Sequence, residues 1–435
     1  MKLNTKRTLL VGLAFLSISA FWQLYDNIVP LILRDSFRLG DDVAGVIMAL
    51  DNVLALVLLP MFGALSDKCK SRFGRRMPFI TVGTFAAAAL ALTIPFADKS
   101  KSLLLFFVAL GLLLIAMGTY RSPAVALMPD VTPKPLRSKG NAIINLMGAL
   151  GGIYTLIMIK LLAFPTYADG RTNYFFVFLA VAVLMVFCIL ALILTIRERK
   201  LVAEMQAINY GVPPEDDQVA AADETGKEKL PAPLKRSLWL ILFSVSLWFM
   251  GYNAVTTAFT KYATQQWAQD VGGAATCLLV ATAGAIVSYI PIGSLSSRIG
   301  RKKMILIGVA TLATCFIVGG LFTAFHPVLY GLFLLVGFAW AAINVNSYPM
   351  VVEIAKGADV GKYTGYYYTF SMSAQIITPI LSGVLLEHVG YWTLFPYAGL
   401  MVALAAITMS LTRHGDNRPQ KPATRLEAFD VPDAD

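Results

Sequence analysis

Long apolar runs alternate with short polar segments along the whole chain. We count twelve such runs of about 20 residues, the length that a helix needs to cross the hydrocarbon core of a bilayer. They lie near residues 9–31, 43–65, 78–96, 103–128, 140–163, 173–196, 237–260, 273–296, 304–325, 328–350, 363–386 and 391–412. Backbone groups in lipid are satisfied only in helices or closed barrels, and runs this apolar cannot be barrel strands. The pattern therefore predicts an all-α polytopic membrane protein with twelve transmembrane helices.

Composition supports the membrane class independently. Hydrophobic residues make up 57% and charged residues 14% of the 435-residue chain, whereas a soluble domain carries about a quarter charged residues. The first apolar run follows a short basic tail, as in a signal peptide, but it is longer and lacks a cleavage-type ending, so we expect it to be retained. The four cysteines show neither a disulfide framework nor metal-ligand spacing.

The net charge of +10 is concentrated on alternate connections between the apolar runs. With the N-terminus inside, Lys and Arg fall in the N-terminal tail and at 68–76, 134–139, 197–236, 298–303, Lys356 and Lys362. This positive-inside distribution predicts that both termini are cytoplasmic in a multi-pass protein of the plasma membrane, such as a bacterial inner membrane. The basic balance therefore reflects topology and does not indicate a nucleic-acid partner.

A charged loop occurs twice, once in each half of the chain. The first copy, at 63–76, carries five cations, one acid and two glycines, and a degenerate copy lies at 293–302. Each copy follows the second of six apolar runs, which is typical of a transporter built from two parallel repeats. We predict an N-terminal six-helix bundle over 1–196, a flexible cytoplasmic linker over 197–236, a C-terminal bundle over 237–412, and a disordered cytoplasmic tail over 413–435.

The first loop is similar to the gate motif of the major facilitator superfamily. The residues that carry this resemblance are Gly63, Asp67, Arg72, Gly74, Arg75 and Arg76. The glycine lies seven residues after the aspartate rather than the usual three, and in this the loop resembles the sucrose:proton symporters of plants and their animal and bacterial relatives. It also resembles the broader glycoside–pentoside–hexuronide:cation symporters. A second block, 123–130 followed by Arg137 and Asn141, is similar to the fourth-span exit of those families. The resemblance implies two six-helix bundles that rock against each other, and sugar as the cargo.

The chain departs from these families at their coupling residues. Sodium-coupled glycoside carriers have two acids in the second span, where this chain has Ala55 and Leu59. Plant sucrose carriers have an acid and an arginine in the fourth span, where this chain has Leu114 and Val125. Arg121 lies one helical turn from the latter. The families' coupling residues therefore cannot be transferred to this chain.

Three ionisable residues within the apolar runs are our candidates for proton coupling: Asp26 in the first span, Asp51 in the second and Arg121 in the fourth. A charge in hydrocarbon costs several kcal/mol, so such residues usually pair or face a cavity. Two nearby carboxylates can hold a transportable proton between them. The alternative is structural: either acid could form hydrogen bonds at the extracellular rim, and Arg121 could be a static partner of a carbonyl group.

Sugar recognition needs aromatic faces together with amide and hydroxyl groups. The candidates for substrate binding are Trp22, Gln23, Tyr25, Asn27, Tyr120, Asn145, Tyr252, Asn253, Trp340, Asn344, Asn346 and Gln375. Each of them alone could be structural, because membrane helices often place Trp and Tyr at interfaces and Asn between helices. The clusters at 22–27, 252–253 and 340–346 carry more weight, since they occupy spans 1, 7 and 10, which line the cavity in this superfamily.

The charged loop itself predicts a gate. Asp67, at the end of the second span, can oppose a neighbouring helix terminus, while Arg72, Arg75 and Arg76 supply bridging charges. Such a network can hold the cytoplasmic side closed and break on switching. The alternative is a pure topology signal. In the second copy Ser297 replaces the acid, so we expect a weaker or positional role there.

We therefore predict a transporter that imports a glycoside, such as a disaccharide, with protons as the coupling ion and sodium as the other candidate. The alternative is a uniporter or a proton-coupled efflux carrier of a non-sugar solute. An enzyme is not indicated, because the three histidines lie near span ends or in the tail and no nucleophile or metal motif is present. We expect no catalytic residue, no cofactor and no metal. The expected partners are a small-molecule substrate and the lipid bilayer, and the expected state is a monomer.

Overall fold

A computed structural model describes residues 3–133, 137–162, 165–209, 231–354 and 360–416. Its helices are α1 (Thr5–Asp35), α2 (Asp41–Lys68), α3 (Met77–Lys99), α4 (Leu103–Asp130), α5 (Arg137–Leu161), α6 (Phe175–Thr195), α7 (Glu198–Asn209), α8 (Ala232–Gln266), α9 (Val271–Ile299), α10 (Arg301–Gly319), α11 (Val328–Ile354), α12 (Val360–His388), the 3-10 turn η2 (Tyr391–Thr393) and α13 (Leu394–Ser410). Within the described ranges, twelve of these helices are long and apolar enough to cross a membrane. The predicted all-helical fold class is thus confirmed.

The chain divides into two compact units. One comprises Met1–Val212 with Val271–Thr276, and the other comprises Pro213–Asp270 with Cys277–Asp435. The end of the first unit falls inside the predicted linker, and most of the predicted tail, from residue 417 on, lies outside the described residues. The exact limits that we predict for the two bundles stay a prediction.

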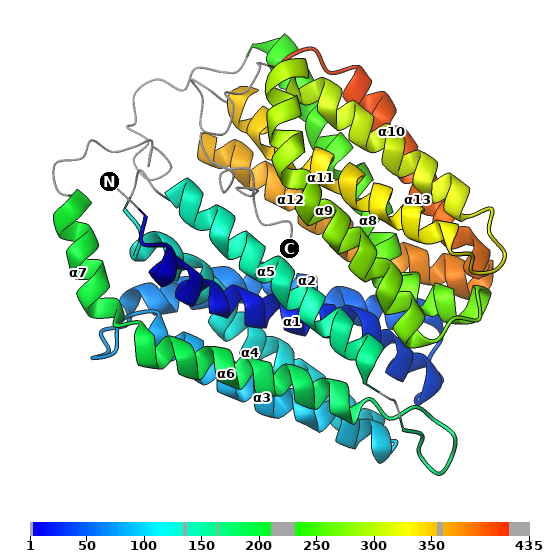
Figure 1. The fold of residues 1–435 in the computed structure, drawn as a ribbon, viewed down its shortest axis with the longest axis horizontal. Coiled ribbons are helices and arrows are strands. Elements are labelled where there is room, and N and C mark those ends of the chain that lie inside the picture. The colour runs from blue at the N-terminus through cyan, green and yellow to red at the C-terminus, as the bar shows by residue number, and fades with distance from the viewer. Residues whose placement is uncertain (1–2, 134–136, 163–164, 210–230, 355–359, 417–435) are drawn as a thin grey trace. The chain divides into compact units, whose positions relative to one another are not determined.

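In the first unit α1 packs along α5 and α6, and α3 packs along α4 and α6, while α2 lies against α4 (Figure 1). In the second unit α8 packs along α12 and α13, and α10 packs along α11 and α13. Four of the five pairings of the first unit thus recur in the same order in the second, once α7 is set aside as a connector. The repeat that the charged loops indicate in the sequence is therefore also present in the packing within each unit.

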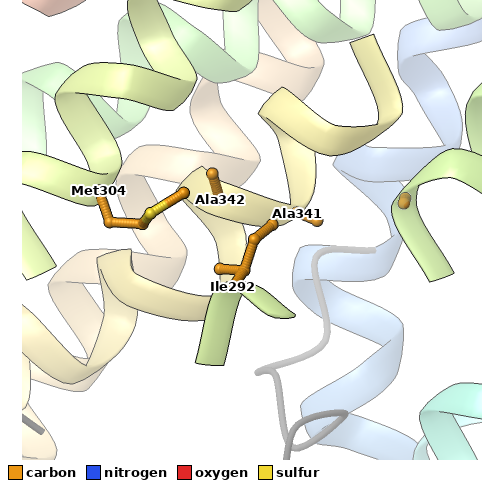
Figure 2. Packing of buried hydrophobic residues seen from close by; sticks show 5 residues of the cluster. Ile292, Met304, Ala341 and Ala342 are labelled. Atoms are coloured by element: carbon orange, nitrogen blue, oxygen red, sulfur yellow. The ribbon is translucent and has the colours of Figure 1, made fainter. Parts of the chain in front are cut away.

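The core of the second unit shows why these helices can approach closely. Ile292 of α9, Met304 of α10 and the small residues Ala341 and Ala342 of α11 belong to one buried cluster, and Figure 2 labels these four side chains. Lipid tails are as apolar as these side chains, so helices in a membrane associate through close packing of small residues rather than through the hydrophobic effect. The alanines of α11 provide that close approach.

The beginning of the predicted linker is helical rather than flexible. Helix α7 occupies Glu198–Asn209, and Met205 within it is buried. Its first residue, Glu198, is only 1% exposed and is bound by main-chain donors of a distant loop. Composition pointed to flexibility over 197–236, but this tertiary attachment fixes the first turn of α7. Residues 210–230 of the linker lie outside the described ranges.

The connection between α5 and α6 is clamped to the end of α3 by charged groups. Arg171 donates to the buried Asp98 Oδ1 at 2.9 Å and to Asp169 Oδ2 at 2.8 Å, and Lys101 lies 2.9 Å from the same oxygen of Asp169. The two cations hold the pKa of the Asp169 carboxyl well below its usual range. Burial, with Asp98 nearby, raises the pKa of Tyr167 to about 12, so this phenol stays neutral at ordinary pH.

Candidate functional site

The loop between α2 and α3 is an ordered turn. After α2 ends at Lys68, the N–H of Gly74 donates to the carbonyl oxygen of Ser71 at 3.1 Å, and the N–H of Phe73 donates to Ser71 Oγ at 3.2 Å. Gly74 has φ +119°, a conformation that L side chains rarely adopt, and this explains the glycine at this position. The turn therefore leads the chain in a defined direction into α3.

Two arginines follow this turn and join the ends of α2 and α4. Arg76, which is 5% exposed, contacts Asp67 of α2 through Nη2 and Asp130 of α4 through Nε at 3.1 Å. Arg75 donates from Nη2 to the other oxygen of Asp130 at 2.7 Å and lies 4.0 Å from Asp67. Arg76 also contacts Ser66 Oγ and, at 3.4 Å, the carbonyl oxygen of Gly63. Two cations and two acids thus hold three parts of the chain together.

Glu198 accepts hydrogen bonds from the main chain at the start of α3. Its carboxylate receives the N–H groups of Arg75 at 2.9 Å, Arg76 at 3.0 Å and Met77 at 2.8 Å. The next residue, Pro78, has no N–H to satisfy. A negative charge at a helix N-terminus interacts favourably with the helix dipole. Any Cβ at Gly74 would meet this carboxylate, so the glycine also makes room for the acid.

These contacts can be compared with the predicted gate residues. The structure brings Gly63, Asp67, Gly74, Arg75 and Arg76 together. Arg72 does not join the network, because its guanidinium lies over the Phe73 ring, 4.9 Å from the centroid. The N-terminus of α3 is bound by Glu198.

Sequence reasoning missed Asp130 and Glu198 as members of this network. Asp130 lies in the quoted fourth-span block, and an acid at the end of a span was the available signal. Nothing in the sequence near Glu198 marked it, because its partners lie more than 120 residues away along the chain.

The second copy of the loop has a comparable acid from the end of its own unit. Asp416, after α13, accepts the N–H of Lys302 at 2.7 Å beside Gly300, which has φ +98°. Lys302 Nζ donates to the carbonyl oxygens of Ser410 at 2.9 Å and Thr412 at 2.5 Å. In both units, therefore, an acid that follows the last membrane-spanning helix (α6 or α13) binds the main chain at the start of the third one (α3 or α10).

The first unit contains the three predicted coupling residues. The Arg121 guanidinium of α4 lies over the Trp22 ring of α1 at 5.5 Å, and Arg121 interacts electrostatically with Asp51 of α2. Tyr25 is in electrostatic range of both Asp51 and Asp26. Asp51 Oδ1 also accepts a hydrogen bond from Asn52 at 2.9 Å. The three predicted coupling residues thus belong to one polar cluster that spans α1, α2 and α4.

Buried donors of α1 next to these charges have no hydrogen-bond partner among the described residues. They are the indole N–H of Trp22 and the hydroxyl of Tyr25. The rings of Trp22 and Tyr25 meet edge to face, 5.5 Å between centroids. Most buried polar groups in proteins are paired, so these two donors are available to hydrogen-bond a ligand or water.

The remaining candidates of the first unit are distributed around this cluster. Asn27, 1% exposed, donates to the carbonyl oxygen of Gln23 at 2.8 Å within α1. Tyr120 is completely buried on α4, next to Arg121. Asn145 lies half-buried on α5, and Gln23 is half-buried on α1.

The second unit contains a preformed aromatic pair. Tyr252 of α8 stacks on Trp340 of α11 with 3.7 Å between ring centroids and 4° between planes, and Phe249 meets the same indole edge to face at 5.3 Å. Trp340 is only 7% exposed, so Tyr252 covers the ring of this candidate for substrate binding. Tyr252 itself is half-buried.

Amide groups lie on the same helices. The Nδ2 atom of Asn253 is buried and has no hydrogen-bond partner among the described residues. Asn344 is 5% exposed, and Asn346 donates to the carbonyl oxygen of Ala342 at 2.9 Å within α11. Gln375 is half-buried on α12. Among the amides, Asn253 therefore has the clearest unmet hydrogen-bonding capacity.

A metal site is not found in the described part of the chain, where no group of three or more His, Cys, Asp or Glu side chains could hold an ion. The described cysteines Cys69, Cys188, Cys277 and Cys315 are free thiols.

Comparison with known proteins gives a family and distant relatives. The family model described as "Major Facilitator Superfamily" matches residues 11–281 and 241–432. Sucrose transport protein SUC3 of Arabidopsis thaliana is 30% identical over 146 residues, 29% of this chain and 23% of that protein. The human proton-associated sugar transporter A is 31% identical over 137 residues, 29% of this chain and 18% of that protein. The chain thus spans about a quarter or less of the length of these two relatives.

Solved structures resemble the whole chain. A crystal structure of a variant of the nucleoside transporter NupG superposes with a TM-score of 0.68 at 14% identity, over 94% of this chain and all of that one. The xylose transporter XylE from E. coli, in an inward-open conformation, gives 0.63 at 14% identity, over 96% of this chain and 97% of that one. At such low identity the likeness supports the fold alone.

Proposed function

Because this chain belongs to the Major Facilitator Superfamily, whose members are transporters rather than enzymes, we propose that it imports a sugar or glycoside by proton symport through alternating access. Two of its distant relatives carry "sucrose transport" and "proton-associated sugar transporter" in their names. The proposal extends those activities to this chain, with sodium as the other candidate for the coupling ion.

The observation that carries the proposal is the charged cluster of the first unit. It contains two carboxylates, Asp26 and Asp51, and one fixed cation, Arg121, in spans α1, α2 and α4. Arg121 balances the charge of Asp51, which leaves the charge of Asp26 in excess, and a proton can neutralise it. Loss of that proton restores the negative charge. The protonated and deprotonated forms of the cluster can then favour different conformations, as a proton-coupled carrier needs.

The second unit supplies the chemistry for a neutral sugar. The half-buried Tyr252, supported from behind by Trp340, offers one aromatic face to the apolar side of a pyranose ring, since the other face is occupied by the stack. The unpaired amide of Asn253 follows directly on the same helix and can donate to a hydroxyl group. We expect binding in the high-micromolar to millimolar range, about 4–6 kcal/mol.

Uptake of a labelled sugar panel into proteoliposomes, with pH and sodium gradients imposed separately, tests the proposal. We expect concentrative uptake with the pH gradient alone. The variant Asp26→Asn should lose uphill accumulation and keep substrate exchange, because an amide preserves shape but cannot titrate. Unchanged accumulation in the Asp26→Asn variant would indicate that Asp51, and not Asp26, carries the coupled proton. Failure of every sugar, together with transport of a lipophilic cation, would refute sugar import and favour the efflux carrier.

One observation favours a second substrate class. Arg121 is a cation beside the unpaired indole N–H of Trp22, and such a pair also suits a carboxylated sugar such as a hexuronide. The same uptake panel should therefore include a hexuronide. A neutral sugar remains the proposal, because Asp51 already interacts with Arg121.

The orientation follows from the charge distribution of the loops. We propose a protein of the plasma membrane with both termini in the cytoplasm, where the Asp67–Arg76–Asp130 network closes one side and opens it on switching. A monomer suffices for this function, because one chain holds both repeats.

A further inference from the structure

The turn between α2 and α3 presents an aromatic ring and a guanidinium at its tip. Ser71 and Gly74 close the turn by main-chain hydrogen bonding, so Arg72 and Phe73 occupy its two central positions. Phe73 is 63% exposed, and its ring is covered only in part by the Arg72 guanidinium at 4.9 Å. A single exposed apolar residue is ordinary in proteins. Here, however, the turn is rigidly built and its tip combines an apolar group with a cation.

Six exposed cations surround this tip, which we call the basic surface. Its members are Lys68, Lys70, Arg72, Arg197, Arg199 and Lys200. The last three flank Glu198, whose carboxylate binds the main chain at residues 75–77, so the start of α7 lies beside the turn. None of the six forms an ion pair with a carboxylate of the described residues, whereas the nearby acids Asp67 and Asp130 are bound by Arg75 and Arg76.

This surface adjoins the end of a membrane span, since α2 ends at Lys68. Anionic phospholipid headgroups attract basic residues next to a span, each with about 1 kcal/mol near the surface. An aromatic side chain at the same level gains energy by entering the interface. The seven-residue spacing between Asp67 and Gly74, longer than the ordinary motif allows, makes room for these residues.

We propose that residues 68–73, together with the start of α7, form a binding surface for the phosphate groups of anionic phospholipids, with Phe73 inserted among the headgroups. The surface holds the α2–α3 turn against the membrane. Its function is independent of the transported substrate and of the coupling ion.

Limited proteolysis of the wild-type protein provides the first test. Trypsin cleaves after Lys70 and Arg72 in the turn, and after Arg38 in an exposed loop of the opposite set of connections. The full chain is reconstituted in nanodiscs of phosphatidylcholine, with or without phosphatidylglycerol. We expect phosphatidylglycerol to slow cleavage at Lys70 and Arg72 several-fold relative to Arg38. An unchanged ratio of the cleavage rates would overturn the proposal.

Variants provide the second test. Lys70→Gln/Arg72→Gln should lower the affinity for phosphatidylglycerol roughly 30-fold, and Phe73→Ser should lower it at unchanged charge. The matched control, Arg38→Gln/Lys99→Gln, removes the same charge from exposed residues of the opposite connections and should leave the affinity unchanged. An equal loss in the control pair would show that only net charge matters and would overturn the site.

A third arm separates the lipid from a soluble anion. Inorganic phosphate is added to nanodiscs of pure phosphatidylcholine, and cleavage in the turn is measured again. We expect no protection, because Phe73 gains nothing from a soluble ion. Protection equal to that given by phosphatidylglycerol would reassign the surface to a free anion. Raising the ionic strength should weaken the lipid effect, since exposed charges are screened within about 8 Å at physiological salt.

Discussion

Removing the carboxylate of Glu198 should destabilise the first unit more than its place at the start of a connector suggests. The side chain is 1% exposed and accepts the N–H groups of Arg75, Arg76 and Met77 at 2.8–3.0 Å. Hydrogen bonds to a charged group contribute about 1.5–3 kcal/mol each, and breaking a buried charged contact costs about 3–5 kcal/mol. In Glu198→Ala, water at the membrane surface can hydrogen-bond some of the three N–H groups that the carboxylate leaves. We therefore expect the free energy of unfolding to fall by about 3 kcal/mol, the low end of this range.

The conservative variant separates charge from shape. Glu198→Gln keeps one acceptor oxygen but loses the favourable interaction of a negative charge with the α3 N-terminus, up to about 2 kcal/mol in partly buried positions. We therefore expect an intermediate loss of stability. Thermal unfolding of the purified protein measures it, and about 2–4 °C per kcal/mol is the expected scale for a unit of this size.

Glu204→Gln is the matched control, because it removes the same charge from the same helix. Glu204 is 46% exposed and lies 3.8 Å from Arg7, so its ion pair contributes at most about 1 kcal/mol. Equal unfolding temperatures for Glu198→Gln and Glu204→Gln would refute the capping role. Gly74→Ala should also destabilise, and part of its cost should vanish in the Glu198→Ala background, since the clash with the carboxylate is then gone.

Three further predictions follow from the network, the aromatic stack and the α5–α6 connection. Asp130→Asn should lower the unfolding temperature more than Asp67→Asn, because the Asp130 side chain is 16% exposed and binds both arginines, while the Asp67 side chain is 54% exposed. Asp67→Asn should chiefly raise the accessibility of cysteines from the cytoplasmic side. Unchanged accessibility with normal transport would show that the loop is only an orientation signal. Tyr252→Ala should abolish sugar-induced thermal stabilisation, whereas Tyr252→Phe should keep most of it, and equal loss in both would assign the role to the hydroxyl group. Because the pKa of Asp169 is lowered in the folded state, its ionised carboxylate stabilises the fold above the unfolded pKa of about 4, and this stabilisation is lost as the pH falls from there towards the lower folded pKa. Asp169→Asn should therefore remove part of the acid sensitivity of the α5–α6 connection. Proteolysis of this connection as a function of pH measures the effect.

The sequence by itself determined the spans and their repeat. Lipid offers no partner for a backbone N–H or carbonyl group, so each span must satisfy its own backbone and is therefore visible as a continuous apolar run. The charged loop was equally visible, because membrane insertion keeps the Lys and Arg residues of short connections on one side of the membrane. For the same reason the intramembrane residues Asp26, Asp51 and Arg121 could be selected without a structure, since each is an expensive exception in an apolar run.

Only the tertiary structure decided which side chains meet. Glu198 reaches main-chain donors more than 120 residues away, and no local pattern in the linker indicates it. The rotation of α8 against α11 places Tyr252 over Trp340. The phenol ring of Tyr252, rather than the indole, is therefore the ring that can offer a face to a ligand. The packing of α4 against α1 likewise places Arg121 over Trp22, and the same unit brings it within range of Asp51. Helix rotation and close approach depend on the fit of many small residues at once, which hydropathy and spacing along one chain do not encode.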